Sequence, residues 1–68
     1  MKIISELRAR RVSKKVPLER LSLISGYSRG RIGAWERGEN APTLPALLAW
    51  VESLGGEIKI EWTSEPKD

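Results

Sequence analysis

The sequence predicts a mainly α-helical domain of four or five short helices, followed by one C-terminal β-strand. Apolar residues recur every three or four positions in four successive segments, which is the period of an amphipathic helix. Ser, Thr, Pro or Gly bounds most of these segments, as is typical of helix ends. After Gly56 the apolar period changes to two, which is typical of a half-buried strand.

The first two predicted helices precede a glycine turn. The first spans residues 2–13, and the second has Pro17 in its first turn and stops at Gly26. Their apolar positions are Ile3, Ile4 and Leu7 in the first helix and Leu18, Leu21 and Ile24 in the second. Arg11 lies four residues after Leu7, so it falls on the same inward face of the first helix.

Two further helices are predicted after this turn. Ser28 caps a helix over residues 29–37, and Thr43 caps a fourth helix that ends at Gly55. The inward positions are Ile32 and Trp35 in the third helix and Leu44, Leu47, Leu48, Val51 and Leu54 in the fourth.

Positive charge is concentrated in the first part of the chain. Residues 1–38 contain ten Lys or Arg and three Glu, whereas residues 39–68 contain two Lys and six Asp or Glu. This asymmetry favours nucleic acid as a partner of the basic part, with an acidic protein as the alternative.

Cysteine and histidine are absent from the sequence. A disulfide framework and a Cys/His zinc site are therefore excluded, and we expect no metal site, no cofactor and no enzymatic activity. The longest apolar runs are only a few residues long, and charge appears early, at Lys2 and Glu6. We therefore expect a cytoplasmic protein without a membrane segment or a signal peptide.

A turn of only two residues, Gly26 and Tyr27, separates the second and third predicted helices. This spacing suits a helix-turn-helix, in which one helix braces another against DNA, although any helical hairpin needs a similar turn. The outer face of the third helix is basic, which favours DNA; its arginines are Arg29, Arg31 and Arg37. The run LRARRVSKKVPLERLSLISGYSRGRIGAWERG and the later TLPALL resemble the phage repressor and Cro type (XRE-like) of helix-turn-helix domain.

This resemblance implies a repressor-like bundle that binds a palindromic operator in double-stranded DNA as a homodimer, with its third helix in the major groove. The base-reading positions of the family fall on Ser28, Arg29, Gly30 and Ala34. Arg31 and Arg37 project beside them and suit phosphates, and family members clamp the DNA backbone at the positions of Asn40 and the Thr43 amide. The resemblance also implies a largely buried ion pair between Arg11 and Glu36.

The sequence departs from the family at three places. Gly30 and Gly33 lie inside the third helix, at a cost of about 1 kcal/mol each relative to alanine. Pro17 and Leu18 occupy positions where the family often has a polar cap and a glutamine that binds phosphate. Leu23 is apolar at a position that is usually polar.

Residues 57–62 alternate polar and apolar side chains, and a single strand needs a partner for its backbone. We predict that it pairs with the same strand of a second subunit, about a two-fold axis near Ile60; some antitoxin-type relatives dimerise in this way. The predicted dimer interface comprises Trp50, Leu54, Ile58, Ile60 and Trp62. The alternative is an exposed tail. The predicted organisation is a DNA-binding domain over 1–55, a dimerisation strand over 56–62 and a disordered tail over 63–68.

Three functions are open at this point. The first is a phage-type repressor or autoregulator. The second is the antitoxin of a toxin–antitoxin pair, which binds a toxin protein and represses its own operon. The third is a protein-interaction module whose basic surface binds an acidic partner.

Overall fold

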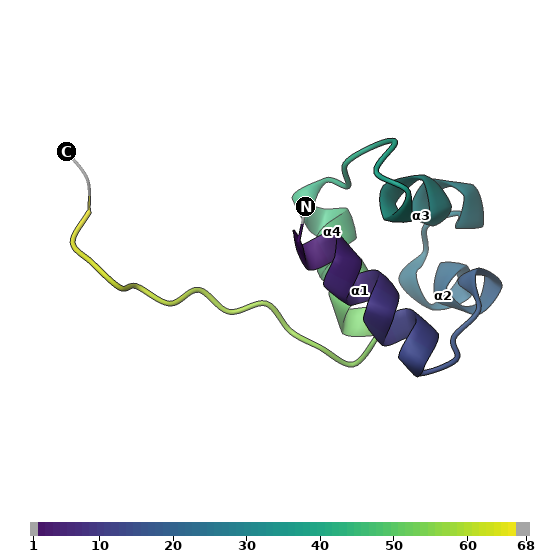
Figure 1. Ribbon diagram of the computed structural model, residues 1–68, viewed down its shortest axis with the longest axis horizontal. Coiled ribbons are helices and arrows are strands. Elements are labelled where there is room, and N and C mark those ends of the chain that lie inside the picture. Colours follow the sequence, from purple (N-terminus) through teal and green to yellow (C-terminus); the bar gives the residue numbers. More distant parts are fainter. Residues whose placement is uncertain (1, 67–68) are drawn as a thin grey trace.

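A computed structural model describes residues 2–66 of the chain, which form four helices joined by short turns and loops. The helices are α1 (Lys2–Ser13), α2 (Leu18–Ser25), α3 (Arg29–Glu36) and α4 (Leu44–Ser53). Helix α2 packs against both α3 and α4, and α1 packs against α3 (Figure 1). The four predicted helices are thus present, with boundaries within about two residues of those expected.

Local chemistry explains where the helices begin and end. The Ser28 hydroxyl accepts a hydrogen bond from the Arg31 amide at 3.2 Å, and the Thr43 hydroxyl accepts one from the Ala46 amide at 3.3 Å. Each bond satisfies an amide that has no partner inside its own helix. Helix α2 ends at Gly26, whose φ of 82° is readily adopted only by glycine.

The core lies where the four helices meet. Trp50, Leu21 and Ile32 are its largest fully buried side chains, and the Trp35 ring packs on Trp50 with 5.7 Å between centroids. The other buried members are Ile4, Leu7, Ala46, Val51 and Leu54. Trp50 was expected at a dimer interface, but it has no exposed surface and packs entirely within its own chain.

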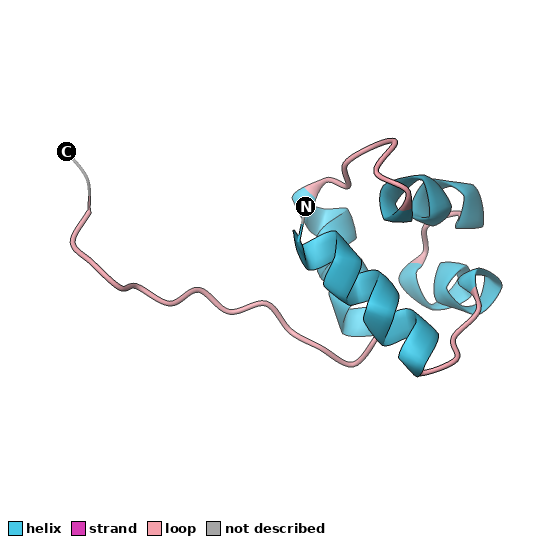
Figure 2. Ribbon diagram, viewed as in Figure 1, coloured by secondary structure: helices cyan, strands magenta, loops and turns pink. Residues whose placement is uncertain are grey.

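The prediction of a C-terminal strand is wrong. Across residues 2–66 the structure is helical with no β-strand, and residues 57–62 run as an unpaired segment away from the bundle (Figures 1 and 2). Polar and apolar residues do alternate here, but a strand needs a hydrogen-bonded neighbour, and no segment within residues 2–66 supplies one. Residues 2–4 form the start of α1 and are therefore not available to pair with this segment. The fold class is therefore all-α.

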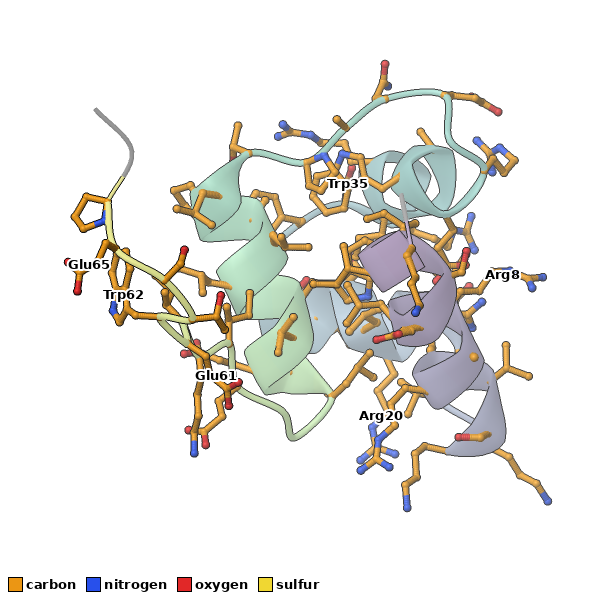
Figure 3. All side chains as sticks on the ribbon, turned by 60° about the vertical axis from the view of Figure 1, so that its left-hand side comes forward. Arg8, Arg20, Trp35, Glu61, Trp62 and Glu65 are labelled. Carbon is orange, nitrogen blue, oxygen red and sulfur yellow. The ribbon has the colours of Figure 1, made fainter. Side chains whose placement is uncertain are left out.

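The C-terminal segment leaves its apolar side chains uncovered. Ile58 is 38% exposed, Ile60 75% and Trp62 87%. Trp62 lies on the segment that projects from the bundle (Figures 1 and 3). Residues 63–66 are exposed and contain neither helix nor strand. Met1 and residues 67–68, which the predicted domain and tail include, lie outside the described residues.

Candidate nucleic-acid interface

The turn between α2 and α3 sets the exposed start of α3, residues 28–31, at the surface. The Gly26 amide donates to the Ser22 carbonyl at 3.0 Å, which closes α2. Tyr27 then packs edge-on against Trp35, with 5.5 Å between ring centroids. Residues 28–31 are exposed, whereas residues 32–35 are buried. Helix α3 is therefore anchored by its second half and presents its first half to solvent.

An ion pair between Arg11 and Glu36 fixes the end of α3. Arg11 Nε donates to Glu36 Oε2 at 2.7 Å, and Arg11 Nη2 donates to Glu36 Oε1 at 2.9 Å. Arg11 Nη1 also donates to the Val16 carbonyl at 2.9 Å. The side chains are only 14% and 5% exposed. Arg11 thus connects α1 to the loop after it and, through a bidentate contact, to α3. These contacts stabilise the fold.

Arg29, the strongest candidate for base recognition, is paired with an acid on α2. Its Nη1 donates to Glu19 Oε1 at 2.7 Å, and both side chains are well exposed. Sequence reasoning missed Glu19, because a separation of ten residues across a turn matches no helical spacing. The fold alone brings these two residues together.

Arg31 rests on two aromatic rings. Its guanidinium carbon lies 5.6 Å from the Tyr27 ring centroid and 5.9 Å from that of Trp35. Such cation–π contacts contribute about 0.5–1 kcal/mol at an exposed site. They restrict the arginine without consuming its hydrogen-bond donors, which remain available for a phosphate. Neither contact was predicted from the sequence.

Arg37 and Glu39 form an exposed ion pair after α3. Arg37 Nε donates to Glu39 Oε2, and Nη2 lies 3.4 Å from Oε1. The hydrogen bond, and after it the opposite charge, raises the pKa of Arg37 and lowers the pKa of Glu39. Both groups are therefore charged at neutral pH. A phosphate that binds Arg37 must compete with Glu39, which sequence reasoning did not foresee.

The remaining candidates occupy different environments. Ser28 and Thr43 are exposed, but their hydroxyls accept the capping bonds of α3 and α4. Asn40 is exposed in the loop between these helices. Ala34 is buried, with 8% of its surface exposed, and so presents only a small part of its methyl group.

The two glycines of α3 differ in what surrounds them. A Cβ atom at Gly33 would lie 3.0 Å from Arg37 Nη1 and 3.8 Å from Leu18 Cδ1, so this glycine belongs to the contact between α2 and α3. A Cβ atom at Gly30 would meet nothing within 4 Å. No contact inside the chain therefore requires a glycine at position 30.

Comparison with known protein families matches residues 7–60 to the helix-turn-helix family. No curated protein and no solved structure matches the chain. Among the described residues, no group of His, Cys, Asp or Glu side chains could hold a metal ion. None of the four helices is both long and apolar enough to cross a membrane, as judged over the described part of the chain.

Proposed function

Because this chain belongs to the helix-turn-helix family of DNA-binding transcription regulators, we propose that it is a repressor that binds a palindromic operator as a homodimer. The observation that carries the proposal is the exposed segment at the start of α3, residues 28–31. In it Arg29 and Arg31 flank Gly30, on a helix whose second half is buried in the core. An α-helix presented in this way fits the major groove of B-DNA.

The arginines divide into two roles. Arg29 reads a guanine through its O6 and N7 atoms, the commonest specific contact in the major groove. Arg31 and Arg37 bind phosphates and set the position of α3 on the duplex. Ser28 and Ala34 contribute weaker base contacts, and Asn40 and the Thr43 amide hold the backbone beyond α3.

Homodimer formation is supported by the uncovered apolar side chains after α4. Ile58, Ile60 and Trp62 remain exposed in the single chain, and a monomeric protein gains nothing from leaving them in water. Glu57 and Ile58 also border an apolar groove between α1 and α4, which Leu54 helps to line. We propose that this groove and the exposed apolar residues form the contact between subunits.

Selection from a library of randomised DNA duplexes tests the function. We expect the full chain to enrich an inverted repeat whose half-sites lie about 34 Å apart, or a multiple of this. Affinity should fall steeply with salt, because Lys and Arg displace counterions from phosphates. Enrichment of a single half-site would contradict the dimer. If no sequence were enriched at low or moderate salt, the proposed function itself would be contradicted.

Gly30→Ala is expected to change stability and DNA affinity in opposite directions. Alanine should raise the free energy of unfolding by about 1 kcal/mol, because it favours the helix and the added methyl group meets no neighbour. The same methyl group should weaken operator binding if the DNA approaches Gly30 closely. Thermal melting and a gel retardation assay measure the two effects. A variant that is more stable and binds DNA as well as the wild type would show that the DNA does not approach this position.

A further inference from the structure

The ion pair between Glu19 and Arg29 lies on the surface that we propose faces DNA. A carboxylate there is unexpected, since it repels phosphates. Its contribution to stability is also small, because both side chains are more than half exposed and water screens their attraction. The position of Glu19 in the first turn of α2 favours that helix, but this effect requires no contact with Arg29. Neither explanation accounts for the contact itself.

The geometry of the pair leaves Arg29 able to bind a base. Only Nη1 of Arg29 is bonded to Glu19, and Nε and Nη2 have no hydrogen-bond partner among residues 2–66. A guanine offers two adjacent acceptors, O6 and N7, which match N–H groups on adjacent nitrogens of one guanidinium. Glu19 can therefore hold one side of the guanidinium while another side contacts the base.

The contact with Glu19 also restricts the Arg29 side chain before DNA binds. A free arginine loses much rotational freedom when it is immobilised on DNA, and an arginine already held by a carboxylate loses less. The negative charge of Glu19 also reduces the attraction of Arg29 for any nearby phosphate, which carries no sequence information. Both effects favour the contact with a base over the contact with the backbone.

We propose that Glu19 is a specificity-determining residue that positions Arg29 for one guanine and suppresses its binding to phosphate. This inference rests on the proposed function. Two substitutions separate the hydrogen bond that Glu19 accepts from the negative charge that it carries. In Glu19→Gln the amide oxygen still accepts a hydrogen bond from Arg29, but the charge is removed. In Glu19→Ala both the acceptor and the charge are removed.

The experiment compares binding of the full-length wild type and both variants to three duplexes. The first is the site selected by the wild type, the second carries adenine in place of one guanine, and the third is a scrambled sequence. Each guanine of the site is tested in turn. We expect Glu19→Ala to lower discrimination at one guanine by about fivefold or more, and Glu19→Gln to retain it within about twofold. Both variants should bind the scrambled duplex more tightly, by about threefold or more, because a negative charge has been removed.

The matched control is Glu52→Ala, which removes an exposed carboxylate from α4, and thermal melting checks that every variant is folded. Equal discrimination by the wild type and Glu19→Ala would overturn the positioning role, even if the protein binds its site. Loss of discrimination equally at every guanine, or in the control, would overturn it as well. A wild type with no base preference would contradict the proposed function and this inference together.

Discussion

Glu36→Ala is expected to lower the free energy of unfolding by about 3–5 kcal/mol, because it leaves the largely buried guanidinium of Arg11, which is 14% exposed, without its carboxylate. Glu36 is 5% exposed and accepts two hydrogen bonds from Arg11, so water cannot readily replace it. Small domains have a total stability of only about 5–15 kcal/mol. The substitution therefore removes a large fraction of what holds this domain together.

Thermal unfolding followed by circular dichroism measures this loss. Each kcal/mol shifts the melting temperature of a domain of this size by about 4–8 °C, so a fall of well over 10 °C is expected. Glu39→Ala is the matched control, since it removes a carboxylate from an arginine pair that is exposed. That control should shift the melting temperature by a few degrees at most. Similar shifts in the two variants would show that burial of the Arg11–Glu36 pair has no energetic consequence.

Four helices and the turn between α2 and α3 were predictable because their signals are local. Ser28 and Thr43 cap helices through bonds to amides three residues later, and Gly26 ends α2 with a positive φ. Each signal depends on a few consecutive residues, so the sequence alone displays it. The inward face of α1 was equally visible from its spacing, which placed Arg11 beside Leu7.

The C-terminal segment shows where such reasoning fails. Alternation at Ile58, Ile60 and Trp62 describes only one side of a possible pairing, and a strand exists only with its neighbour. This chain contains no such neighbour among the described residues, so the segment stays unpaired.

The candidate interface was predictable in its residues but not in their pairing. Arg29, Arg31 and Arg37 were evident from charge on one helix face. Their partners differ in origin: Glu19 lies on α2 and Tyr27 in the turn, whereas Trp35 and Glu39 lie four and two residues after the arginines that they contact. Only the pair between Arg29 and Glu19 joins two helices, and it therefore depends on how α2 and α3 pack in three dimensions. The sequence therefore identified the charged residues, and the structure identifies the side chain that each of them contacts.

Arg29→Ala is expected to remove most of the preference for one base pair in each half-site. A bidentate arginine–guanine contact contributes about 1–3 kcal/mol of discrimination, so each half-site should lose about fivefold to 150-fold in affinity. Two half-sites that act independently should lose about twice that free energy when both subunits carry the substitution. The free protein should change little in stability, because Arg29 makes only one exposed ion pair.

Base-by-base competition distinguishes this loss from a general loss of charge. Arg31→Ala should weaken binding to all sequences similarly and reduce the salt dependence by about one unit of slope, as expected for a phosphate contact. Lys14→Ala removes the same charge from an exposed position just after α1 and should leave base preference unchanged. If Arg29→Ala instead weakened every sequence equally, Arg29 would contact only phosphate. The base preference would then have to come from other side chains or from the shape of the DNA.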